Sequence, residues 1–151
     1  MTVKVEVSGV LTKRGALMTL GAEMQKKLED EVKRAAVFTA NYARSAVRSG
    51  AKNGIVYEKY KPRRTHRASA PGEAPANDTG ALIETITQQP TQGGWLVGST
   101  IKYSKWLEFG TQSMAERPFF RPALKKATKE WRERVINLVG AKKVRLEEVI
   151  K

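Results

Sequence analysis

Apolar residues recur in steps of three and four over the first third of the chain, while polar residues fill the positions between them. The mean step is about 3.6 residues, which is one turn of an α-helix. We therefore predict a long amphipathic helix that ends at Ser49-Gly50. Its buried face is expected to hold Leu17, Leu20, Met24, Leu28, Val32, Ala35, Phe38, Tyr42 and Ala46.

Three other segments are predicted to be strands. Valines at every second position from Val3 to Val7 predict a half-buried strand that ends near Gly9. Residues 83–89 and 95–101 predict a hairpin, because the sequence PTQGG between them has the composition of a turn.

Two further helices are predicted after the hairpin. Residues 103–109 make about two turns, with Gly110 in the left-handed C′ position. Pro122 suits the first position of the last helix, because the N–H that proline lacks is unpaired there. Gly140 is expected to end that helix, whose apolar face holds Leu124, Ala127, Trp131, Val135 and Leu138.

Residues 51–79 have no hydrophobic period and hold three prolines and two glycines. We interpret them as a long loop, of a length that is uncommon in compact domains unless the loop has a function. Asp78 or Thr79 is expected to cap a short turn through Ala81-Leu82. The elements together predict one α+β domain over residues 1–140, with a small, mostly antiparallel sheet against two long helices. A charged tail follows over 141–151.

Composition adds one strong feature, which is positive charge. The 151 residues include 28 Lys and Arg against 15 Asp and Glu, a net charge of +13. Residues 44–68 hold eight of these cations and one acid, so this segment has a net charge of +7. An excess of this kind is typical of chains that contact phosphates or acidic protein surfaces.

Other features of the composition narrow the class of protein. The chain has no Cys, which excludes disulfides, thiolate metal sites and cysteine nucleophiles. No apolar run approaches 18 residues and no signal peptide is visible, so we expect a cytosolic product without a membrane partner. The single His66 stands among cations with no nucleophile beside it, and Ser99 lacks the glycines of a nucleophile elbow. We expect no enzyme, cofactor or metal.

Two motifs of unusual composition remain. The first is YxxWLEFGT at residues 103–111, followed by RPFFRPA at residues 117–123; the second is SAPGEAPANDTGAL at residues 69–82. Together they resemble the tail-completion proteins, also called head–tail joining or neck proteins, of long-tailed bacteriophages. Members of that family often have Pro where this chain has Ala74, and a basic residue and Ser where it has Glu84 and Thr85.

The resemblance implies a virion structural protein that forms a ring at the phage head–tail junction, assembled in the host cytoplasm. A sixfold ring is favoured, and a twelvefold ring fits the sequence equally well. The implied partners are further copies of the chain, the tail tube or tail terminator protein, and the head connector or adaptor proteins. Genome DNA would pass through the lumen without sequence readout. The alternative function is a sequence-independent double-stranded DNA-binding protein.

The first motif makes sense as a structural joint. Trp106, Leu107 and Phe109 are expected to fasten a short helix onto the sheet, and Glu108 to pair with Arg117 or Arg121. Pro118 and Pro122 restrict φ, so the chain entering the last helix loses little conformational entropy on folding. Part of the motif is also a candidate for contact between subunits. The full set is Tyr103, Trp106, Leu107, Glu108, Phe109, Gly110, Thr111, Arg117, Pro118, Phe119, Arg121 and Pro122.

The basic loop provides a second set of candidate residues. A tight grip on phosphates would hinder the passage of a genome, whereas a docking loop can hold dense charge without that cost. We therefore predict that the loop contacts protein rather than DNA, through Lys59, Lys61, Arg63, Arg64 and Arg67.

Overall fold

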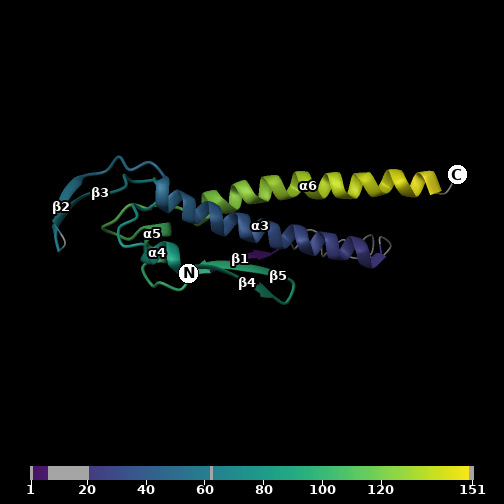
Figure 1. Cartoon of the computed structure of the whole chain (residues 1–151), viewed down its shortest axis with the longest axis horizontal. Coiled ribbons are helices and arrows are strands. Elements are labelled where there is room, and N and C mark those ends of the chain that lie inside the picture. Colours follow the sequence, from purple (N-terminus) through teal and green to yellow (C-terminus); the bar gives the residue numbers. More distant parts are fainter. Residues whose placement is uncertain (1, 7–20, 62, 150–151) are drawn as a thin grey trace.

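The computed structural model describes residues 2–6, 21–61 and 63–149, and these residues confirm the α+β class (Figure 1). A three-stranded sheet and a separate two-stranded ribbon accompany two long helices. In chain order the elements are β1 (Thr2–Glu6), α3 (Gly21–Ser49), β2 (Val56–Tyr60), β3 (Arg63–Arg67), α4 (Ala81–Glu84), β4 (Ile86–Thr91), β5 (Gly94–Ser99), α5 (Ser104–Phe109) and α6 (Phe120–Val149).

The three-stranded sheet has the order β1-β5-β4, and both pairings are antiparallel. It confirms the predicted hairpin, although its first strand begins at Ile86 because residues 81–84 form α4. It also confirms the N-terminal strand, of which residues 7–9 lie outside the described residues. The turn is shorter than predicted, because Pro90 and Thr91 extend β4 and pair with Trp95 and Gly94. Proline has no N–H to donate, and β4 accommodates it as an edge strand.

Helix α3 lies between the sheet and α6 (Figure 1). The predicted helix is confirmed over its described part and ends at Ser49, while residues 17–20 of the predicted face lie outside the described residues. The fully buried side chains of α3 are mostly small, and they are Ala36, Thr39, Ala40, Ala43 and Val47. The predicted face from Val32 to Ala46 is only half-buried. Small side chains let the backbones approach closely, so the alanines occupy the tightest contact.

Helix α6 differs from the prediction at both ends. It begins at Phe120, so Pro122 lies inside the first turn rather than at its first residue. It continues through Gly140 to Val149, so the predicted stop at Gly140 is wrong and the tail is helical as far as Val149. A glycine costs a helix interior only about 1 kcal/mol relative to alanine, and the Lys, Arg, Leu and Glu residues after it favour a helix.

The segment 51–79 contains regular structure that the sequence did not predict. Strands β2 and β3 form an antiparallel ribbon, which projects at one end of the molecule (Figure 1). The rest of the segment is irregular, with a positive φ of 80° at Gly72. Of the two predicted caps of α4, Thr79 accepts the N–H of Ala81 through its hydroxyl at 3.4 Å, although Gly80 occupies the N-cap position. Asp78 does not cap the helix and binds the ribbon instead.

Candidate functional site

Residues 103–123 fold around the carboxylate of Glu108, which is fully buried on the inner side of α5. Its oxygens accept hydrogen bonds from the backbone N–H groups of Phe119 (2.9 Å), Phe120 (2.9 Å) and Arg121 (2.8 Å). The first N–H groups of a helix have no partner within the helix, and that end carries a partial positive charge. Glu108 of one helix therefore caps the N-terminus of the next.

Arg121 completes this cap from its outer side. Its Nε donates to Glu108 Oε1 at 3.3 Å, and its Nη2 donates to the backbone oxygen of Glu108 at 2.7 Å and to Glu116 Oε2 at 2.6 Å. The hydrogen bond to Glu116, followed by the interaction with Glu108, raises the pKa of Arg121 above its ordinary value. The predicted pairing of Glu108 with an arginine is confirmed, and the arginine is Arg121. We call Glu108, Arg121 and the first turn of α6 the Glu108 joint.

Arg117, the other predicted partner, connects the two sequence motifs. Its guanidinium donates to the backbone oxygen of Ser69 through Nε at 3.4 Å and Nη2 at 3.3 Å. The N–H of Gly72 donates to the backbone oxygen of Glu116 at 2.9 Å. The first residues of the second motif thus lie directly against the start of the RPFFRPA block.

The connection between α5 and α6 contains one residue that must be glycine. Gly110 has φ 74° and ψ −175°, a conformation that glycine adopts almost alone, rather than the predicted left-handed helical one. A Cβ at this position would lie 2.7 Å from the backbone oxygen of Met114, whose N–H in turn donates to Thr111 Oγ1 at 3.1 Å. Pro118 is half-buried just before the fully buried Phe119.

The prediction that Trp106 and Phe109 fasten α5 onto the sheet as buried residues is wrong. Their exposed fractions are 49% and 59%, and that of Tyr103 is 37%. A helix of six residues has one inner face, and Ser104, Leu107 and Glu108 occupy it; Leu107 packs against the core as predicted. We call the three outward residues, Tyr103, Trp106 and Phe109, the aromatic face.

The ribbon has two different faces, because side chains alternate along a strand and cross-strand partners share a side. The pairs Tyr57–His66 and Lys59–Arg64 form the inward face, where Lys59 and Arg64 make ion pairs with Asp78. His66 Nδ1 lies 3.8 Å from Asp78 Oδ1. The hydrogen bond from Lys59 is the main cause that lowers the pKa of Asp78, and Arg64 and His66 contribute further.

The outward face of the ribbon consists of the pairs Val56–Arg67 and Tyr60–Arg63, with Glu58 and Thr65 between them. Tyr60 is 77% exposed, and Arg67 is exposed. Arg63 lies 3.6 Å from Glu58. Lys61 follows β2 directly at the tip. The five cations predicted as one contact set are therefore divided: two bind Asp78, and Lys61, Arg63 and Arg67 remain at the tip and outer face.

Asp78 is a site residue that the sequence reasoning missed, since it was interpreted as a helix cap. The sequence offered one signal, since Asp78 follows closely after a segment of net charge +7 whose cations attract a carboxylate. The same segment is fastened by Lys52, whose Nζ donates to the backbone oxygens of Ala74 (3.2 Å) and Pro75 (2.9 Å). Burial lowers the pKa of Lys52, and the charge of Glu73 partly opposes that change.

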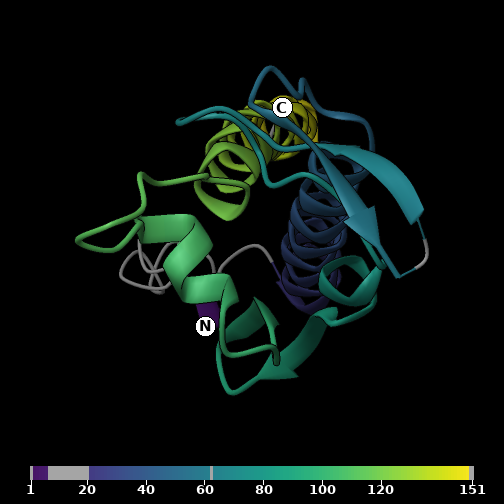
Figure 2. The ribbon, with the colours of Figure 1, turned by 90° about the vertical axis from the view of Figure 1, so that its left-hand side faces the viewer.

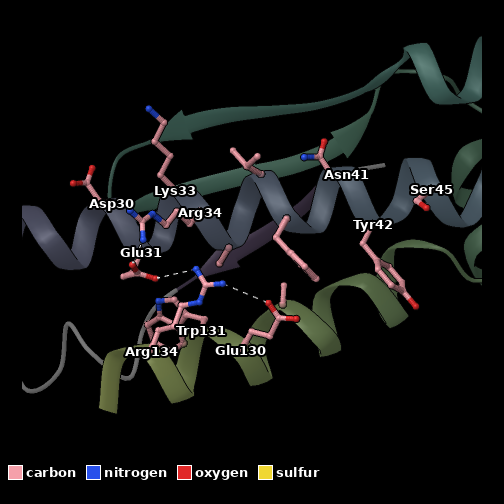
Figure 3. Close-up of a pocket in the computed structure, with 14 residues that line it drawn as sticks. Asp30, Glu31, Lys33, Arg34, Asn41, Tyr42, Ser45, Glu130, Trp131 and Arg134 are labelled. Atoms are coloured by element: carbon pink, nitrogen blue, oxygen red, sulfur yellow. Dashed lines mark hydrogen bonds and ion pairs between the residues drawn. The ribbon is translucent and has the colours of Figure 1, made fainter. Parts of the chain in front are cut away.

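A groove of about 700 Å³ runs between α3 and α6 (Figure 3). Four of its charged side chains pair with one another, since Arg134 lies 3.9 Å from Glu31 and 3.8 Å from Glu130, and Arg34 lies 2.8 Å from Glu31. Lys126 Nζ lies 4.8 Å from the ring centre of Tyr42. The indole N–H of Trp131 is buried there without a hydrogen-bond partner.

Comparison of the chain with protein-family models, curated proteins and solved structures gives no match. Within residues 2–6, 21–61 and 63–149, no group of three His, Cys, Asp or Glu residues is placed to hold a metal ion. No helix in that part of the chain has the length and apolar character needed to cross a membrane.

Proposed function

We propose that this chain is a structural protein of the phage head–tail junction, which forms a homo-oligomeric ring and joins the tail tube or tail terminator to the head connector. The proposal rests on the resemblance of residues 69–82 and 103–123 to tail-completion proteins. It involves no catalysis and no cofactor, and it places the protein in the virion.

The observation that carries the proposal is the position of the aromatic face. The two segments that bear the resemblance meet through the hydrogen bonds from Arg117 to the backbone oxygen of Ser69. Helix α5, within the second of these segments, presents Tyr103, Trp106 and Phe109 with substantial exposed fractions. Aromatic residues gathered on a rigid surface are enriched at protein interfaces, where a few of them supply most of the binding energy. This arrangement favours a protein that assembles over one that acts alone.

Native mass spectrometry and electron microscopy of the purified chain test the proposal. The expected result is a closed ring of six or twelve copies of the 16.8 kDa subunit. A triple variant carries Arg63→Gln, Arg64→Gln and Arg67→Gln. In cells that supply this variant in place of the wild type, we expect heads and tails not to join. The affinity of the same variant for duplex DNA should be unchanged. A monomer that binds duplex DNA tightly would contradict the proposal.

The ribbon favours one alternative, a sequence-independent double-stranded DNA-binding protein. A two-stranded ribbon fits the major groove of DNA, and Lys61, Arg63 and Arg67 lie on its tip and outer face. Phosphate contacts of this kind weaken steeply with salt, because counterions are released on binding. The alternative predicts a monomer whose duplex affinity falls linearly with salt concentration on logarithmic axes. The slope of this line should be smaller for the Gln variant.

A further inference from the structure

We propose that the aromatic face of one copy packs against the outward face of the β2–β3 ribbon of the next copy. This inference rests on the proposed self-assembly and names the two surfaces that perform it. The first surface is Tyr103, Trp106 and Phe109 on α5. The second is Val56, Tyr60, Arg63 and Arg67 on the ribbon.

The chemistry of the two surfaces is complementary. Guanidinium groups stack on the faces of aromatic rings, where the ring quadrupole attracts the cation. The α5 surface already shows this preference within one chain, since the Arg121 guanidinium lies 5.4 Å from the ring centre of Phe109 and Lys105 Nζ lies 5.8 Å from that of Trp106. The ribbon offers further guanidinium groups at Arg63 and Arg67, with the apolar Val56 and Tyr60 beside them.

The inward face of the ribbon cannot serve the same purpose. Lys59 and Arg64 are committed to Asp78, and His66 stands beside the same carboxylate. This contact fixes which side of the ribbon is turned outward, so the outward residues are presented in one orientation. A surface with a fixed orientation loses less conformational entropy when it binds.

The positions of the two surfaces fit a head-to-tail contact. Both lie toward the same end of the molecule along its long axis (Figure 1), but the end-on view places α5 on one side and the ribbon on the opposite side (Figure 2). When two different patches on opposite sides bind each other, one copy of the pair retains a free aromatic face and the other retains a free ribbon. Such contacts extend from copy to copy, and they close into a ring when the rotation between copies allows it.

A second copy fits the aromatic face better than a nucleic-acid duplex does. The faces of aromatic rings carry negative electrostatic potential, which attracts cations. The anionic phosphate backbone of an intact duplex therefore has no favourable contact with the rings of Trp106 and Phe109. The guanidinium groups of Arg63 and Arg67 do have one. The ribbon alone would also suit DNA, so the experiment must involve both surfaces.

Two variants remove one surface each: Trp106→Ala with Phe109→Ala, and Arg63→Gln with Arg67→Gln. Sedimentation velocity over a range of concentrations should show that each variant stays monomeric where the wild type assembles. We expect the dissociation constant to rise at least about tenfold, as for truncation of interface hot spots. The matched controls are Ile136→Ala and Arg132→Gln, which alter an exposed apolar residue and an exposed cation on α6 and should assemble normally.

Mixing the two variants gives the decisive measurement. The aromatic variant retains its ribbon, and the ribbon variant retains its aromatic face, so a head-to-tail contact allows one pairing and no further growth. Native mass spectrometry should detect a 1:1 heterodimer that neither variant forms alone, and this result also shows that both variants fold.

Three results would overturn the contact. Rings formed by both single-surface variants would exclude these surfaces while leaving the proposed function in place. Normal assembly of the ribbon variant alone would mean that the aromatic face binds something other than the ribbon. A wild-type chain that stays monomeric would exclude both the contact and the ring, and tight duplex binding by that monomer would support the DNA-binding alternative.

Discussion

Two carboxylates hold parts of this molecule together, and they do so in opposite surroundings. Glu108 is fully buried and accepts three backbone hydrogen bonds at the N-terminus of α6. Asp78 is partly exposed and binds the side chains of Lys59 and Arg64. Glu108 is the acceptor for buried backbone N–H groups that water does not reach. Asp78 binds cations that water can also hydrate.

This difference sets what each carboxylate contributes. Loss of a buried acceptor leaves its donors unsatisfied, and the protein bears their full desolvation cost. Exposed ion pairs are screened by solvent and contribute little to global stability, but they can fix the position of a local element. The Glu108 joint is thus expected to maintain the fold, and Asp78 is expected to orient the ribbon.

The largest effect is expected at the buried carboxylate. Glu108→Ala leaves the N–H groups of Phe119 and Phe120 without a partner, and should lower the free energy of unfolding by roughly 3–5 kcal/mol. Glu108→Gln keeps the shape and one acceptor oxygen, so we expect a loss of about 1–2 kcal/mol. Urea denaturation followed by circular dichroism measures both. An alanine variant within about 1 kcal/mol of the wild type would show that the cap is dispensable.

A smaller and more local effect is expected at Asp78. Asp78→Asn removes the anion that holds Lys59 and Arg64, so trypsin should cleave the ribbon faster while the melting temperature falls less than in Glu108→Ala. Glu58→Gln is the matched control, because Glu58 pairs with Arg63 on the outward face of the ribbon and takes no part in the contact with Asp78. Equal cleavage rates in Asp78→Asn and the wild type would contradict the orienting role.

Acid should weaken the same contact in the wild type. The folded-state pKa of Asp78 is lowered, so its contribution is fully present above the ordinary pKa of aspartate, about 3.9, and is lost as pH falls through the lower folded-state pKa. The difference in melting temperature between the wild type and Asp78→Asn should therefore be constant near neutral pH and shrink in this acid range. A difference that stays unchanged at the lowest pH of the folded protein would exclude the contribution.

The smallest effect on stability is expected at the aromatic face. Trp106→Ala removes a side chain that is about half exposed, so the free energy of unfolding should change by about 0.5 kcal/mol or less. Phe119→Ala, in the buried core beside the Glu108 joint, is the matched comparison and should cost roughly 3–5 kcal/mol. Similar losses of stability from the two substitutions, measured by thermal unfolding, would show that Trp106 is buried in the core.

The parts of the fold that follow from a hydrophobic period could be predicted from the sequence. Helix α3 is of this kind, whereas the end of α3 and the hairpin β4–β5 follow from stop and turn residues, and the pairing of Glu108 with an arginine follows from charge. The depth of burial could not be predicted in the same way. An apolar cluster such as residues 106–109 shows that side chains prefer to leave water, but not whether a partner subunit or the same chain covers them.

Two further errors have a common physical cause, which is that tertiary contacts override local signals. Residues 56–67 lack an apolar face, so their pattern resembles a loop; cross-strand hydrogen bonds and the Asp78 contact stabilise the ribbon instead. Gly140 resembles a helix stop, but a stop also needs a following segment that prefers another conformation. The residues after Gly140 favour a helix, and α6 continues.

The continuation of α6 through Gly140 has a mechanical consequence. A helix rises about 1.5 Å per residue, so the nine residues from 141 to 149 form a lever of about 14 Å. Gly140 is exposed, and among the described residues a Cβ at this position would meet no atom within 4 Å. Bending stiffness is lowest where the backbone has the greatest freedom, which in a helix is at glycine. A load applied to the C-terminal end of α6 would therefore bend the helix at Gly140 first, and leave the Glu108 joint at the other end unstrained.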